Sequence, residues 1–131
     1  MIEAQEGRRP VLERYCGESG GDIQVAIELL GAEDDVEVDF VEMGGQTGSS
    51  VFEEASPYYN RTIVRKRLRK LDLIAAERDF DGPDFLKAYV QGHELEVLKG
   101  ANSVLGSTEF VLVECSLIPV NKGCPLTHAK V

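Results

Sequence analysis

The chain has 131 residues, of which 43% are hydrophobic, and it carries a formal net charge of −9. This length suits one domain with a packed core, and the acidic balance disfavours nucleic acid as a partner. No apolar stretch approaches the ~20 residues of a membrane span, and the first residues lack the apolar segment of a secretory signal. We therefore expect a cytoplasmic protein without stable membrane insertion.

The residues that could form disulfides or bind metals are few. The chain has three cysteines, Cys16, Cys115 and Cys124, and two histidines, His93 and His128. The number of cysteines is odd and no CxxC pair occurs, which disfavours a disulfide framework or a zinc site. The histidines show no metal-ligand spacing, so we predict no metal. Cys115 ends an apolar run and is predicted to be a buried structural thiol.

The first half of the chain contains short elements separated by glycine-rich turns. Residues 1–4 are compatible with the end of a strand, and a helix is predicted from Pro10 to Gly17. Residues 23–30 predict a buried strand, with a helix as the alternative, and residues 36–41 alternate as a half-exposed strand does. Residues 44–60 form a long loop of the kind that is often functional.

Residues 61–70 carry six basic residues and no acidic one. They fit either a strand or a helix, and Leu71–Ala76 predicts a helix. The charges are typical of a solvated face or of a protected edge strand. The alternative is a patch for anionic substrates or lipid headgroups.

The second half predicts a strand–helix–strand unit. Residues 85–90 predict a buried strand, residues 94–105 a helix, and residues 110–115 a strand covered on both faces. Gly100 interrupts the helical stretch, so two short helices are the alternative. A unit of this length makes the two strands parallel neighbours.

The corner Val90–Leu95 combines a glycine with polar side chains. In open α/β folds, ligands bind where strands end and helices begin. Gly92 permits close approach of a ligand to the backbone, and the free N–H groups of the following helix can receive an anion. The alternative is a tight turn in which Glu94 caps the helix and His93 has a structural partner.

The stretch LKAYVQGHELEVLKGA, followed by FVLVE, resembles FkbM-type S-adenosylmethionine-dependent methyltransferases. Weaker similarities lie at IEAQ, at Gly48-Ser49-Ser50, at Leu71-Asp72 and in SLIPVNKGCPL. The resemblance implies a Rossmann-like class I methyltransferase core, with a mostly parallel sheet and flanking helices. It also implies O-methylation of a hydroxyl on a sugar or other small metabolite, with S-adenosyl-L-methionine as cofactor.

The resemblance also implies roles for individual residues. Among the expected cofactor-binding residues, Glu3 would accept hydrogen bonds from the cofactor ribose, and Gly92, Glu94 and Glu114 would complete that set. Gln91, Tyr89 and His93 would form the catalytic side of the cleft. His93 is the candidate base, because the reference pKa of histidine lies nearest neutrality.

Two departures from the family pattern affect these expectations. Tyr89 stands where the family has Asp, and a phenol is neutral near pH 7. No complete G-x-G-x-x-G occurs, and Glu3 has only two residues before it. We therefore expect residues 1–131 to form a single partial domain, truncated at both ends, with weak or no cofactor binding. The alternative is a decayed enzyme or a non-catalytic interaction module, such as a homodimer that pairs open sheet edges.

Overall fold

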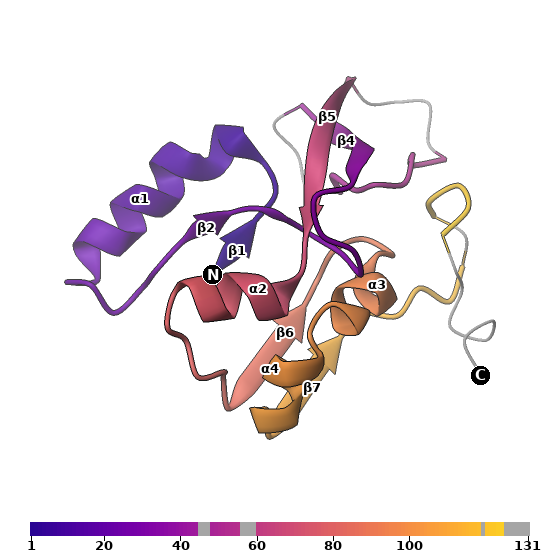
Figure 1. The fold of residues 1–131 in the computed structure, drawn as a ribbon. Helices are drawn as coiled ribbons and strands as arrows, with labels where there is room; N and C mark the ends of the chain where they lie inside the picture. Colours follow the sequence, from indigo (N-terminus) through magenta and orange to yellow (C-terminus); the bar gives the residue numbers. More distant parts are fainter. Residues whose placement is uncertain (45–47, 56–59, 119, 125–131) are drawn as a thin grey trace.

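A computed structural model describes residues 1–44, 48–55, 60–118 and 120–124. The fold is α/β, as predicted, and is built from small sheets and short helices (Figure 1). His128 and parts of the loop 44–60 and of the stretch SLIPVNKGCPL lie outside the described residues.

The N-terminal elements are β1 (Ile2–Glu3), the 3-10 helix η1 (Glu6–Arg8), α1 (Arg9–Glu18) and β2 (Ala26–Ile27). Pro10 lies in the first turn of α1, where its missing N–H removes no helical hydrogen bond. β1 pairs with β2 in parallel, with Ile2 opposite Ala26. The predicted strand end at the N-terminus and the helix after it are confirmed.

The predicted single strand over residues 23–30 is wrong in its extent. The segment contains β2 and then β3 (Leu29–Leu30), with Glu28 between them. The backbone N–H of Glu28 donates to the carbonyl of Glu3 at 2.9 Å, whereas Leu29 is already paired with Leu68. The segment therefore changes its pairing partner at Glu28, which divides it between two sheets.

Residues 61–70 form a strand, which decides between the two alternatives. β5 (Arg61–Arg69) pairs antiparallel with β4 (Glu37–Met43) and parallel with β3, in the order β3-β5-β4. The strand is therefore central, and the edge-strand interpretation is wrong. Five of its basic side chains pair with carboxylates, and these are Arg61, Arg65, Lys66, Arg67 and Arg69. Such pairing leaves little positive charge for an anionic ligand.

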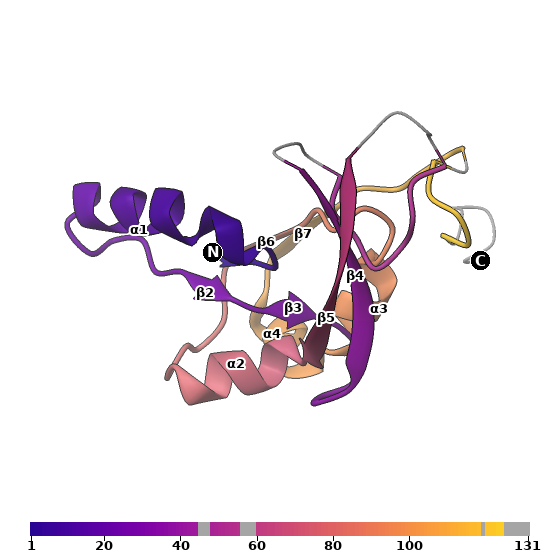
Figure 2. The ribbon, with the colours of Figure 1, turned by 90° about the horizontal axis from the view of Figure 1, so that it is seen from above.

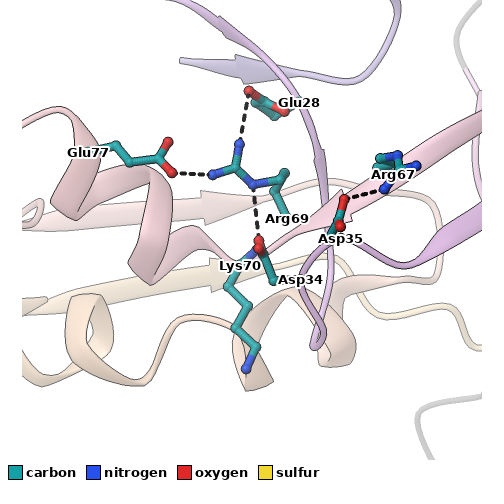
Figure 3. A network of polar contacts seen from close by, with 7 residues as sticks. All are labelled: Glu28, Asp34, Asp35, Arg67, Arg69, Lys70 and Glu77. Carbon is teal, nitrogen blue, oxygen red and sulfur yellow. Dashed lines mark hydrogen bonds and ion pairs between the residues drawn. The ribbon is translucent and has the colours of Figure 1, made fainter.

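The most connected of these side chains is Arg69 (Figure 3). Its guanidinium donates to Asp34 at 3.0 Å and to Glu77 at 2.5 Å, and it lies 3.7 Å from Glu28. Hydrogen bonding to Asp34 is the main cause that raises the pKa of Arg69. One side chain therefore ties β5 to the turn before β4, to the β2–β3 junction and to α2.

The second half of the chain is a strand–helix–helix–strand unit. α2 (Leu71–Glu77) leads to β6 (Phe85–Ala88), α3 (Glu94–Lys99), α4 (Asn102–Ser107) and β7 (Phe110–Val113). β6 and β7 are parallel neighbours, with Phe85 opposite Phe110, as predicted. The alternative of two short helices is confirmed, and α3 and α4 are separated at Gly100 and Ala101.

The predicted burial of these strands is wrong. Phe85 is 55% exposed, Phe110 65% and Leu112 51%, and Cys115 is also exposed. Figure 2 shows α2 and α4 on one side of β6 and β7. Leu86, on the covered face, packs against the core cluster of Leu71, Ala75, Ala101 and Val104, whereas the opposite face has no such cover among the described residues. An apolar run alone did not distinguish one covered face from two.

The expected single, mostly parallel sheet is also not observed. The described strands form three small sheets, in which β1–β2, β3–β5 and β6–β7 are parallel and β4–β5 is antiparallel. One core cluster, around Leu71, Ala101 and Val104, contacts Ile2 and Leu86 from two of these sheets. The sheets therefore share a core without continuous hydrogen bonding. In the described part of the chain, no helix combines the length and the apolar composition of a transmembrane span.

Candidate functional site

The corner after β6 has an unusual backbone. Gln91 has φ +54° and Gly92 has φ +99°, so two successive residues occupy the left-handed region. This region is uncommon for a residue with a side chain and is held only where neighbouring groups stabilise it. A Cβ on Gly92 would lie 2.2 Å from Sγ of Cys124, which explains why glycine occupies this position.

Glu94 stabilises the corner from within. Its Oε1 accepts hydrogen bonds from the backbone N–H groups of Val90 and Gly92, both at 3.1 Å, and the side chain is almost fully buried. A carboxylate at this position satisfies one buried and one partly buried donor that the turn would otherwise leave unpaired. The alternative of a tight turn is therefore correct, but Glu94 holds the turn itself and does not cap the helix, and the expected partner of His93 is absent among the described residues.

A cavity of about 370 Å³ lies next to the corner. Its walls come from residues 2–5, 28–30, 48–51 and 89–91, together with Arg8, Phe40 and His93. The volume lies in the range of small-molecule sites, which start at roughly 300 Å³. Polar and apolar side chains both line it, as expected for a site that orients a ligand.

His93 is the most distinctive group on this wall. Both imidazole nitrogens are buried and have no hydrogen-bond partner among the described residues. The ring packs edge-on against Phe52, with centroids 6.1 Å apart. Burial lowers the pKa of His93, because it disfavours the charged form more than Glu96 and Glu94 favour it. The imidazole is therefore neutral near pH 7 and retains an acceptor nitrogen.

Glu3 also lines the cavity, at the end of β1. One of its carboxylate oxygens accepts the N–H of Gln5 at 2.8 Å, which fixes the side chain at the strand end. Glu28 and Arg8 line the same cavity. A carboxylate here can accept hydrogen bonds from the hydroxyls of a ligand.

Four of the predicted site residues come together at this cavity, namely Glu3, Tyr89, Gln91 and His93. Tyr89 is 55% exposed, and the ammonium group of Lys87 lies 5.5 Å from the centroid of its ring. Gly92 and Glu94 are buried behind the wall. Glu114 is exposed and accepts a hydrogen bond of 3.4 Å from the Gln91 side chain, which places it beside the cavity rather than on its wall. The roles of all seven residues stay predictions.

Sequence reasoning missed two residues that shape the site. The hydroxyl of Ser50 and the side-chain amide of Asn121 both donate to the carbonyl of Gln91. Both residues lie in stretches that resemble the family, Gly48-Ser49-Ser50 and SLIPVNKGCPL. That similarity was the available signal, although it did not indicate which atoms the side chains contact.

Comparison with known protein families identifies a match. The family model of the methyltransferase FkbM domain matches residues 10–129. No curated protein and no solved structure matches the chain. Because the matched residues make up most of the chain and include the corner at 90–94, the protein belongs to the FkbM methyltransferase domain family.

Proposed function

We propose that this protein is an S-adenosylmethionine-dependent methyltransferase that acts on a hydroxyl of a sugar or other small metabolite. The observation that carries the proposal concerns His93. This residue lines the cavity, and both nitrogens of its neutral imidazole have no hydrogen-bond partner among the described residues. Membership of a methyltransferase family supports the reaction class. The parallel pairs β1–β2 and β6–β7 support a Rossmann-like arrangement of this part of the chain.

The residues at the cavity fit the cofactor in two respects. Glu3 ends a parallel strand, where an acidic side chain can accept hydrogen bonds from ribose hydroxyls. The cavity that Glu3 lines has a volume of about 370 Å³, which is enough for a small ligand. Bound S-adenosylmethionine would supply an electrophilic methyl group whose leaving group is a neutral thioether.

The remaining chemistry falls to the chain itself. The acceptor hydroxyl must lie in line with the methyl group, and water must be kept out. As its oxygen forms the new bond to carbon, the hydroxyl loses a proton, and a nitrogen of His93 would take that proton. The Gln91 amide would orient the acceptor at the cavity wall, and Tyr89 would contact it near the opening.

An NMR titration with S-adenosylhomocysteine tests the proposal. No complete G-x-G-x-x-G occurs in the chain, so we expect weak binding, roughly millimolar, which calorimetry would not detect as saturable heat. The amide signals of Glu3, Gln91 and His93 should shift in a saturable manner. Glu3→Gln and His93→Gln should weaken the response, whereas the exposed Glu13→Gln should not. Shifts confined to residues away from the cavity, or none at all, would refute the proposal.

A second candidate is an interaction module that forms a homodimer. The observation that favours it is the exposed apolar face of β6 and β7, with Phe85, Phe110 and Leu112 more than half exposed. Patches of this kind often mark protein interfaces. Sedimentation across a wide concentration range should then show a dimer that Phe110→Ser disrupts, and a monomer throughout would exclude this candidate.

A further inference from the structure

The carbonyl oxygen of Gln91 is held by two side chains that are distant in sequence. Oγ of Ser50 donates to it at 3.0 Å and Nδ2 of Asn121 donates at 2.9 Å. Ser50 is 2% exposed and Asn121 5%. Because buried polar groups are costly to leave unpaired, both donors are committed to this oxygen.

The peptide that follows Gln91 is therefore fixed on two sides. Ser50 and Asn121 hold its carbonyl, while Glu94 accepts the N–H of Gly92. Gln91 itself has φ +54°, a conformation that its own sequence does not favour. External hydrogen bonds are thus what keeps the turn in this conformation.

Both donors are anchored to other parts of the fold. Ser50 exchanges two backbone hydrogen bonds with Val41 of β4, at 2.8 and 3.1 Å. Asn121 forms a bridge with Glu54, and the next residue, Lys122, donates its N–H to the carbonyl of Glu53 at 2.8 Å. The corner is consequently clamped between a loop that is tied to β4 and the segment after β7.

We infer that Ser50 and Asn121 are positioning residues, which hold the Gln91 carbonyl and thereby fix the places of Gln91 and His93 on the cavity wall. Gln91 forms the turn together with Gly92, and His93 follows directly, so a rotation of the peptide between Gln91 and Gly92 would move both Gln91 and His93. The significance of this arrangement for methyl transfer rests on the proposed function, whereas the geometric effect can be measured without it.

The experiment compares Ser50→Ala, Asn121→Ala and the double variant with Ser50→Thr, which retains the hydroxyl. Ser103→Ala and Asn102→Ala, on exposed positions of α4, serve as matched controls. We expect the amide signals of Gly92 and His93 to move in the alanine variants while those of β4 and β5 stay in place. Ser50→Thr should restore the original signals, and the controls should leave the corner unchanged.

A titration with S-adenosylhomocysteine tests the positioning role separately from the proposed function. If the probe shifts His93 in the parent protein, that response should be lost in the double variant. If the probe shifts nothing in the parent protein, the proposed function fails, and movement of the Gly92 and His93 signals still supports the positioning role. Unchanged corner signals in both alanine variants would overturn the inference. Should an alanine variant not fold, Ser50→Cys, which is nearly isosteric and a weaker donor, provides the same comparison.

Discussion

The carboxylate of Asp72 accepts a hydrogen bond of 3.0 Å from the backbone N–H of Val104, across 32 residues of sequence. Its other oxygen accepts the N–H of Ser103, also at 3.0 Å. The first residues of α4 have no cap of their own, since Ala101 precedes the helix without a side-chain hydrogen bond. An aspartate on α2 therefore performs the capping of α4 and joins the two helices.

Replacing Asp72 should destabilise the fold. Asp72→Ala leaves two N–H groups at the start of α4 without an acceptor, and the loss of such a cap costs about 1 kcal/mol. Chemical denaturation should show a lower free energy of unfolding for this variant. Asp81→Ala, which changes an exposed aspartate in the turn before β6, is the control and should change it little. Equal effects of the two substitutions would contradict the capping role.

A comparison within β5 tests the network in Figure 3. The Arg69 side chain is 23% exposed and serves three carboxylates, whereas Arg65 is 63% exposed and pairs mainly with Asp39. Arg69→Met should lower the free energy of unfolding by about 1 kcal/mol, because three acidic groups lose their shared cation while water still screens them. Arg65→Met should change it less. The reverse order would show that exposed pairs, and not the network, stabilise this sheet.

The parts of the fold that the sequence predicted well are those with local determinants. The helix after Pro10, the alternation around Phe40 and the parallel pairing of β6 with β7 follow from turn residues and apolar periodicity. The family resemblance rested on the corner, and the family match confirmed it. The corner also gathers Tyr89, Gln91 and His93 at one cavity, because all three lie within a single turn.

The sequence-based predictions that were wrong concern features that depend on contacts between distant segments. Nothing in residues 23–30 shows that pairing changes at Glu28, since that depends on the positions of β1 and β5. The exposure of Phe110 and Cys115 depends on which face the helices cover. Likewise, Ser50 and Asn121 meet Gln91 from separations of 41 and 30 residues, which no local pattern encodes.

Two glycines should respond to substitution in opposite directions. A Cβ on Gly100 would lie 2.1 Å from the carbonyl oxygen of Gly31, a backbone atom that cannot easily move. Gly100→Ala should therefore destabilise the protein by about 1–3 kcal/mol. A Cβ on Gly106, inside α4, would meet no atom of another element within 4 Å, so Gly106→Ala should stabilise the protein by about 0.5–1 kcal/mol. Thermal unfolding of both variants gives the comparison, and a stabilising Gly100→Ala would contradict the close approach to Gly31.

Because of His93, the free energy of unfolding should decrease as the pH is lowered from neutral. Burial lowers the pKa of His93 in the folded protein, whereas the unfolded chain has the ordinary value of about 6.5. As the pH falls through 6.5, the unfolded state takes up the proton first, so the free energy of unfolding decreases. Urea unfolding at pH 7.5 and pH 5.5 should therefore show a loss of stability in the parent protein that is smaller in His93→Gln.

The variant His93→Gln serves as its own control for the other titrating groups. Glu94 and Glu96, which oppose the effect of burial on the His93 pKa, are present in both proteins, as are the other carboxylates. The difference between the two pH-dependent losses therefore reports the imidazole alone. A direct NMR titration should place the pKa of His93 below that of a histidine in the unfolded chain. If the imidazole instead titrates at or above the ordinary value, it is solvated or ion-paired, and the neutral base proposed at the cavity wall is lost with it.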